Sequence, residues 1–254
     1  MWVFWRTVST RDGRQLWPQP RKPETGYLDP MARNESFIFD LDGTLVDSVY
    51  QHVMAWQEAL QAERIDISTW RIHRRIGMSG GLATGMLLRE VDVAISPALL
   101  DRLQTRHSEA YARLVRSVRP LPGALPLLDY LTRTGIPWAI ATSGNMDVAK
   151  HNLELLGVEP TKAPVITRQD VKRAKPDPDL FLAAAERLQL DITSAVIVGD
   201  SIWDMLAARR ARGLGVGVLS GGYGQDELER AGAIRVYEDP ADLLRHIDEI
   251  GGRA

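Results

Sequence analysis

The chain has 254 residues, a formal net charge of -2 and 44% hydrophobic residues. This suits one sizeable α/β domain, or one domain with a small insertion, and excludes a disordered chain. With no cysteine, disulfides, thiolate catalysis and cysteine-based zinc sites are excluded. The near-neutral charge gives no reason to expect nucleic acid or an acidic membrane as partner. No apolar run reaches the roughly 20 residues that span a bilayer. We therefore expect a cytoplasmic protein.

Residues 1–30 differ in composition from the rest of the chain. No helical or strand period persists there, and the segment contains Trp2, Trp5, Trp17, Pro18, Pro20, Pro23 and Pro30. We interpret it as a poorly ordered extension, because termini are usually unstructured unless tied down. Two alternatives stay open: an arm whose tryptophans dock onto a partner, and a true start at Met31.

After this extension, short apolar runs alternate with helical patterns such as 147–156 and 180–188. We predict strands at 36–39, 138–141, 164–166, 195–198, 215–218 and 233–236. Strands that are apolar throughout and alternate with helices indicate a parallel sheet covered on both faces. The predicted fold is therefore α/β, with a doubly wound, Rossmann-like parallel sheet.

The strand pattern is absent from residues 49–118. Val49, Val53, Trp56 and Leu60 recur at helical spacing, and 99–115 forms a second long helical pattern. We predict an all-helical domain at 49–118, inserted into a catalytic core made of 31–48 and 119–254.

The first candidate motif follows the first predicted strand directly. Asp40 and Asp42, at positions i and i+2, leave the strand in the same direction, and Gly43 permits the sharp turn after them. One carboxylate of such a pair can attack phosphorus while the other donates and later accepts a proton. The alternative is a polar turn that only ends the strand.

Two further motifs are expected at the same sheet edge, where parallel sheets bind ligands. Thr142, Ser143 and Gly144 follow the second strand and suit a phosphate-binding turn at a helix start, or an ordinary helix cap. Lys175 stands in a loop stiffened by the prolines of Lys-Pro-Asp-Pro. This cation either offsets charge on the phosphoryl group or is solvated in a turn.

The fourth motif, Gly199-Asp200-Ser201 with Asp204, follows the strand 195–198. Strand-end carboxylates suit a hard cation that prefers oxygen ligands. The chain has only five histidines and no HxH or HxxxH cluster, so Mg²⁺ is favoured over Zn²⁺. The alternative is that Asp200 caps a helix.

Taken together, these motifs resemble those of the haloacid dehalogenase superfamily over about residues 36–240, and the helical insertion resembles that family's small cap. The resemblance implies Asp40 as the nucleophile and Asp42 as the acid and base. Mg²⁺ would bind the Asp40 carboxylate, the Asp42 backbone carbonyl and Asp200, with Asp204 supporting its water shell. Thr142, Ser143 and Gly144 would hold the phosphoryl group, and Lys175 would neutralise charge. Asp42 also argues against dehalogenation.

Relatives with such a cap include phosphoglycolate phosphatases, sugar-phosphate phosphatases and β-phosphoglucomutases. His52 and Trp56 match positions that both groups share. The cap loop 76–80 resembles the family's specificity loop, so Gly77 and Ser79 are candidate substrate contacts. Gly80 stands where mutase-like members carry an arginine for a second phosphate, and Gly199 where they commonly carry glutamate.

We therefore expect a Mg²⁺-dependent phosphatase that hydrolyses a small phosphorylated metabolite, such as phosphoglycolate or a sugar phosphate, through an aspartyl-phosphate. A phosphomutase and a catalytically silent binding protein are the alternatives. His73, Arg74 and Arg75 either reach an anionic substrate group or form a solvated helix face. The sequence does not predict the oligomeric state.

Overall fold

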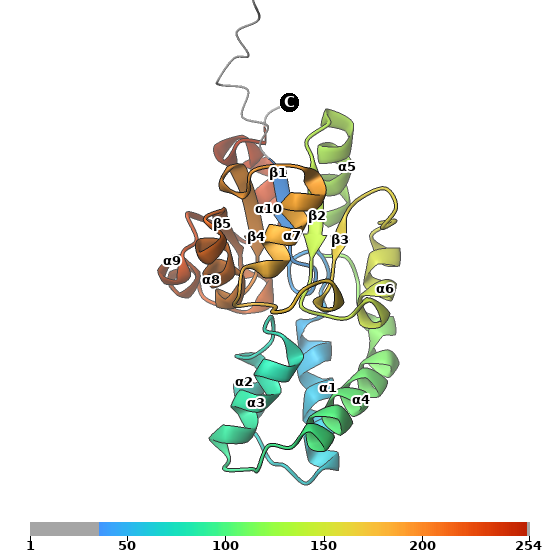
Figure 1. The fold of residues 1–254 in the computed structure, drawn as a ribbon. Coiled ribbons are helices and arrows are strands. Elements are labelled where there is room, and N and C mark those ends of the chain that lie inside the picture. Colours follow the sequence, from blue (N-terminus) through green and yellow to red (C-terminus); the bar gives the residue numbers. More distant parts are fainter. Residues whose placement is uncertain (1–35, 253–254) are drawn as a thin grey trace, which may run out of the picture. The chain divides into compact units, whose positions relative to one another are not determined.

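The computed structural model describes residues 36–252, and its fold is drawn in Figure 1. The predicted extension at 1–30 lies outside the described residues. Among the described residues, no helix is long and apolar enough to cross a membrane.

A six-stranded parallel sheet forms the core, with the strand order β3-β2-β1-β4-β5-β6. The bounds are β1 Ser36–Phe39, β2 Trp138–Ala141, β3 Val165–Ile166, β4 Ala195–Gly199, β5 Leu214–Val218 and β6 Arg235–Tyr237. In register, Phe39 lies opposite Ile140 on one side and Val198 on the other. The predicted doubly wound parallel sheet is confirmed. Only the last strand is clearly displaced, because the predicted Ala233 and Ile234 belong to the turn after α9.

Side chains of the central strands alternate between two buried layers, as the two-residue period of a strand requires. Phe37, Phe39 and Val196 pack on one face with α5 (Ala124–Thr134), α6 (Met146–Leu155) and α10 (Pro240–Arg245). Ile38 and Ile197 pack on the other with α7 (Asp179–Leu188) and α8 (Ile202–Ala211). Beside β5 and β6, α9 (Gln225–Ala231) completes the core. Burial on both faces explains why these strands are apolar throughout.

The first four α-helices after β1 form the predicted cap, and α5 then returns the chain to the core before β2 (Figure 1). They are α1 (Val49–Ala62), α2 (Thr69–His73), α3 (Gly80–Glu90) and α4 (Pro97–Leu114). The Ser96 side chain caps α4 by accepting a hydrogen bond from Leu99 N, and Pro97 occupies the first turn. The buried stripe of α4 then runs through Leu103 and His107. We propose 49–118 as the extent of this cap.

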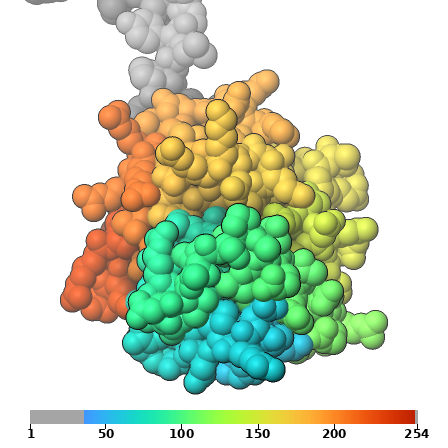
Figure 2. Space-filling view, turned by 60° about the horizontal axis from the view of Figure 1, so that its bottom comes forward, coloured from blue at the N-terminus to red at the C-terminus, as the bar shows by residue number. Residues whose placement is uncertain are grey.

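The carboxyl ends of the central strands point toward the cap (Figure 1). Figure 2 shows the cap, coloured cyan to green, against the yellow and orange residues of the core. Because the motif residues follow β1, β2 and β4 directly, the fold carries them to this edge of the sheet.

Candidate active site

Asp40 is the first residue after β1, and its position is fixed by the sheet. Its backbone N–H donates to the carbonyl of Val198 at 2.9 Å, which continues the ladder beyond the strand. Its carboxylate is 4% exposed, and Oδ1 lies 2.5 Å from Nζ of Lys175. Gly43 follows with φ +85°, a left-handed conformation that favours glycine, so the chain can turn back sharply after Asp42.

Lys175 is completely buried between two carboxylates. Its Nζ lies 2.5 Å from Asp40 Oδ1 and 2.8 Å from Asp204 Oδ1. Burial alone would lower the pKa of Lys175, but the attraction of Asp204 and Asp40 outweighs it and raises the pKa above its ordinary value. The alternative of a solvated lysine in a turn is therefore wrong, and Lys175 is a fixed positive charge beside Asp40.

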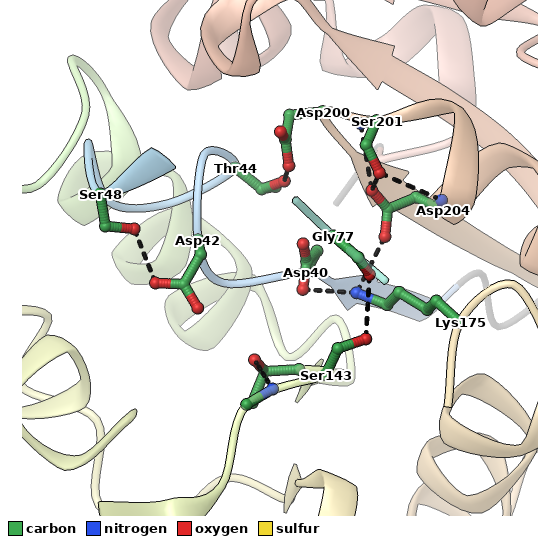
Figure 3. A network of polar contacts seen from close by, with 12 residues as sticks. Asp40, Asp42, Thr44, Ser48, Gly77, Ser143, Lys175, Asp200, Ser201 and Asp204 are labelled. Atoms are coloured by element: carbon green, nitrogen blue, oxygen red, sulfur yellow. Dashed lines mark hydrogen bonds and ion pairs between the residues drawn. The ribbon is translucent and has the colours of Figure 1, made fainter. Parts of the chain in front are cut away.

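The fourth motif places Asp200 and Asp204 near Asp40, with Asp204 also beside Lys175 (Figure 3). Thr44 Oγ1 donates to Asp200 Oδ1 at 3.0 Å. In the first turn of α8, Asp204 accepts from Ser201 N at 3.1 Å and from Ser201 Oγ at 2.5 Å. The helix cap is therefore Ser201, and the alternative that Asp200 caps the helix is wrong.

Asp40, Asp200 and Asp204 form a compact cluster of buried carboxylates. One oxygen from each lies within 4.8 Å of the others. Burial, with repulsion from Asp204, raises the pKa of Asp40 to about 7 despite the opposing attraction of Lys175. Burial likewise raises the pKa of Asp200 well above its ordinary value. Three carboxylates around one lysine are an excess of buried negative charge that a hard divalent cation would balance.

Two glycines border the Asp200 carboxylate. A Cβ atom built on Gly43 or on Gly221 would lie under 3.0 Å from Asp200 Oδ2, closer than real Cβ atoms come. The space beside this oxygen therefore exists only because both neighbours lack a side chain. Such a cradle, together with the all-oxygen donor set, fits a small cation.

Asp42 turns away from this cluster and toward the cap (Figure 3). Its Oδ1 accepts hydrogen bonds from Ser48 Oγ at 2.6 Å and Asn152 Nδ2 at 2.9 Å, and it lies 3.3 Å from His52 Nε2. Burial acts to raise the pKa of Asp42, but His52 and Ser48 outweigh it and lower the pKa below its ordinary value. The two carboxylates of the first motif thus have different surroundings.

The turn after β2 brings Thr142, Ser143 and Gly144 to the same edge. Gly144 N donates to Thr142 Oγ1 at 3.0 Å, and Ser143 Oγ donates to the carbonyl of Gly77 at 3.0 Å. Asn145, rather than Thr142 or Ser143, occupies the cap position of α6. The second motif therefore links the core to the cap loop.

A cavity of about 430 Å³ separates the cap from the core. Asp40, Asp42 and all three residues of the second motif line it. Gly77 lines it from the cap loop with φ +90°. Ser79 N donates to the carbonyl of Lys175 at 3.2 Å. The cap loop thus contacts both the turn after β2 and the lysine loop.

Several residues on or near the cavity wall were given no functional role by the sequence analysis. His52 Nδ1 lies 3.1 Å from His107 Nε2, and the His52 ring stacks on Tyr111 with centroids 4.0 Å apart. Asn152 bonds both Tyr111 and Asp42 at 2.9 Å. The residues that contact one another here are far apart in the chain, so the sequence does not show that they meet. It could have indicated each of them only as a polar residue on an otherwise apolar helical stripe, as with His107 in α4.

The arginines before the cap loop are paired with carboxylates. Arg74 binds Glu227 and stacks over Tyr223 at 4.1 Å, whereas Arg75 lies 2.5 Å from Glu90. His73 Nε2 lies 2.8 Å from the carbonyl of Gly221. The solvated helix face is therefore wrong for His73 and Arg74, which contact the core. Only Arg75 of the three lines the cavity.

Comparison with known proteins gives the family. The model of the haloacid dehalogenase-like hydrolases matches residues 35–212. This chain is a haloacid dehalogenase-like hydrolase. Among curated relatives, this hydrolase is 36% identical to hexitol phosphatase A of Escherichia coli, over 66% of the chain and 76% of the relative. It is 32% identical to phosphoglycolate phosphatase of Agrobacterium fabrum, over 76% of the chain and 82% of that relative.

Solved structures agree with this family. A hydrolase from Pseudomonas syringae is 56% identical, with a TM-score of 0.83 over 85% of this chain and 98% of that one. A β-phosphoglucomutase from Clostridium difficile is 25% identical, with a TM-score of 0.74 over 85% of this chain and 96% of that one. The predicted family, the capped α/β fold and the assignment as a hydrolytic enzyme are confirmed, and the relatives named above include phosphatases.

Proposed function

We propose that this hydrolase is a Mg²⁺-dependent phosphatase that acts on a small phosphorylated metabolite through an aspartyl-phosphate. The observation that carries the proposal is the pairing of buried Asp40 with Lys175 at the wall of a cavity that Asp42 also lines. Relatives named hexitol phosphatase and phosphoglycolate phosphatase support hydrolysis of a phosphate monoester.

Mg²⁺ fits the carboxylate cluster, because its donors are oxygens and the glycine cradle leaves room for a small ion. Asp40, Asp200 and the Asp42 backbone carbonyl would hold it, with Asp204 supporting its water shell. When bound, the ion supplies positive charge that offsets the charge of the phosphoryl oxygens and of the nucleophile.

Asp40 attacks phosphorus in the first step, and the bond from phosphorus to the leaving oxygen breaks as the Asp40–phosphorus bond forms. Lys175 offsets the negative charge beside Asp40. Thr142, Ser143 and Gly144, which line the cavity at the end of the neighbouring strand, orient the phosphoryl group. Gly77 and Ser79 of the cap loop contact the substrate where the cap meets the core.

Asp42 transfers the protons. In the first step its carboxyl group gives a proton to the leaving oxygen. In the second step the carboxylate takes a proton from water, which attacks phosphorus and breaks the bond to Asp40. The hydrogen bonds of Ser48 and Asn152 favour the ionised form that the second step needs. His52 Nε2, 3.3 Å from Asp42 Oδ1, favours the same ionised form.

The substitution Asp40→Asn tests this proposal. It removes the nucleophile while keeping the shape of the side chain, so we expect phosphate release to fall by at least about 10³-fold. Asp47→Asn, an exposed carboxylate in the same loop, is the matched control and should keep wild-type rates. Activity that survives in Asp40→Asn would remove Asp40 from its role.

A phosphomutase is the second candidate, supported by the structural likeness to a β-phosphoglucomutase. Against it, Gly80 offers no side chain to a second phosphate, and Arg75 is paired with Glu90. A screen of phosphorylated metabolites in the presence of Mg²⁺ separates the candidates. Conversion of a sugar 1-phosphate to its 6-phosphate without phosphate release would favour the mutase, and no turnover at all would favour a silent binding protein.

A further inference from the structure

Helices α3 and α4 of the cap present uncharged polar groups to the cavity. Thr84 on α3 and Gln104 and His107 on α4 all line the cavity. Gln104 and His107 are three residues apart in one helix, so they lie on the same face. Thr84 Oγ1 donates to the carbonyl of Gly80 at 2.7 Å, which leaves its oxygen able to accept. We call these three residues the polar cap wall.

Gln104 occupies space that Gly80 leaves open. A Cβ atom built on Gly80 would lie 3.0 Å from Oε1 and 3.2 Å from Nε2 of Gln104. The Gln104 amide has no hydrogen-bond partner within residues 36–252. An amide lining a cavity with both its donors and its acceptor free matches a hydroxyl group, which also donates and accepts.

His107 is a second unpartnered group of the same wall. It is 5% exposed, and its Nδ1 is buried without a hydrogen-bond partner among the described residues. Trp56 stacks on its ring with centroids 4.2 Å apart, and Nε2 faces His52 at 3.1 Å. Burial and the nearby His52 lower the pKa of His107 well below its ordinary value, so the ring is neutral. A buried polar atom left unpaired is costly, and a ligand that pairs with it gains that energy.

Within the described part of the chain, the arginines that line the cavity lie outside the polar cap wall. The Arg75 guanidinium lies 2.5 Å from Glu90. Arg168 stands on the core side and donates to the carbonyl of Val171 at 2.7 Å. Neither belongs to the polar cap wall, which therefore offers a substrate hydrogen bonds rather than a full positive charge.

We infer that the polar cap wall binds hydroxyl groups of the leaving group, with Gln104 as the specificity-determining residue. The substrate class is then the phosphate ester of a neutral polyol or sugar rather than of a short carboxylic acid. This inference rests on the proposed phosphatase function and names the substrate of the same site. The cavity of about 430 Å³ also lies in the range of pockets that enclose ligands larger than a two-carbon acid.

The test compares kcat/KM for a hexitol 6-phosphate, phosphoglycolate and an aryl phosphate, all with Mg²⁺. The wild type should prefer the hexitol phosphate to phosphoglycolate. Gln104→Met keeps the length of the side chain and removes its hydrogen bonds. It should lower the ratio of kcat/KM for hexitol phosphate to that for aryl phosphate by about 10- to 100-fold. Gln61→Met, on the exposed face of α1, is the matched control and should keep the wild-type ratio.

Gly80→Arg is a second variant that does not alter Gln104 itself. Its side chain would displace the Gln104 amide and add a cation, so the preference should move from hexitol phosphate toward phosphoglycolate. An unchanged ratio in Gln104→Met, or a wild type that prefers phosphoglycolate, would overturn the inference and leave the proposed function intact. A wild type that releases phosphate from none of the three esters would overturn both.

Discussion

At the scale of single residues, the site is defined by how its charges are paired. Asp40 shares Lys175 with Asp204, whereas Asp42 is surrounded by hydrogen-bond donors. The same residue type therefore has a raised pKa at position 40 and a lowered pKa at position 42. Two carboxylates two residues apart thus acquire opposite pKa shifts from their surroundings alone.

Lys175→Met tests the contribution of the buried cation. Methionine fills similar space but leaves Asp40 and Asp204 without their positive partner, so the charge on the reacting groups is no longer offset. We expect kcat to fall by about 10²- to 10³-fold and the thermal midpoint to drop. Lys172→Met, an exposed lysine in the same loop, is the control. Equal kcat values in the two variants would contradict this role for Lys175.

The raised pKa values predict how Mg²⁺ and pH act together on stability. The pKa of Asp40 in the folded protein is about 7, above the ordinary 3.8, so Asp40 favours folding by staying protonated. This contribution is fully present below the ordinary value and is lost as pH rises through the folded value. The pKa of Asp200 is raised in the same way.

In metal-free protein, we therefore expect the thermal midpoint to fall from about pH 5 to about pH 8. The increase caused by Mg²⁺ should be larger at the higher pH, where the carboxylates are free to bind it. Thermal scans with and without Mg²⁺ at both pH values measure this. An equal increase at both would count against Mg²⁺ binding at the carboxylate cluster.

At the scale of secondary-structure elements, the strands and the motifs at their ends could be predicted from the sequence. A short strand such as Ser36–Phe39, three of whose four residues are apolar and all of which are buried, leaves little freedom for the residue that follows, so Asp40 had to lie at the sheet edge. The cap contacts could not be predicted in this way. Whether His107 of α4 meets His52 of α1 depends on how the two helices rotate and cross, and helical spacing within one segment does not contain that information.

The packing of α4 gives a prediction for the cap. Leu103 is fully buried in the cap core and directly precedes Gln104 of the polar cap wall. Leu103→Ala should lower the free energy of unfolding by about 2–5 kcal/mol because it leaves a cavity. Leu125 lies on α5 and is 46% exposed, so Leu125→Ala should lower the free energy of unfolding much less. Urea denaturation of both variants measures the difference, and equal midpoints would show that α4 does not depend on Leu103.

At the scale of the whole molecule, every predicted site residue lies within the described part of the chain, residues 36–252. Removing residues 1–30 should therefore leave kcat/KM within about twofold and the thermal midpoint nearly unchanged. Parallel assays of the truncated and full chains test this. A large loss of activity would favour the docking arm.

The cradle around Asp200 has a consequence for how related genes are read. Gly221 belongs to none of the four motifs, yet a methyl group at this position would collide with the Asp200 carboxylate. A homologue could keep Asp40, Asp42, Lys175 and Asp200 and still be unable to place Asp200 as it lies here if position 221 carried a side chain. Motif searches would count such a gene product among the active enzymes. A glycine at position 221 is thus a criterion to apply beside the motifs when working enzymes are separated from inert copies in genome surveys.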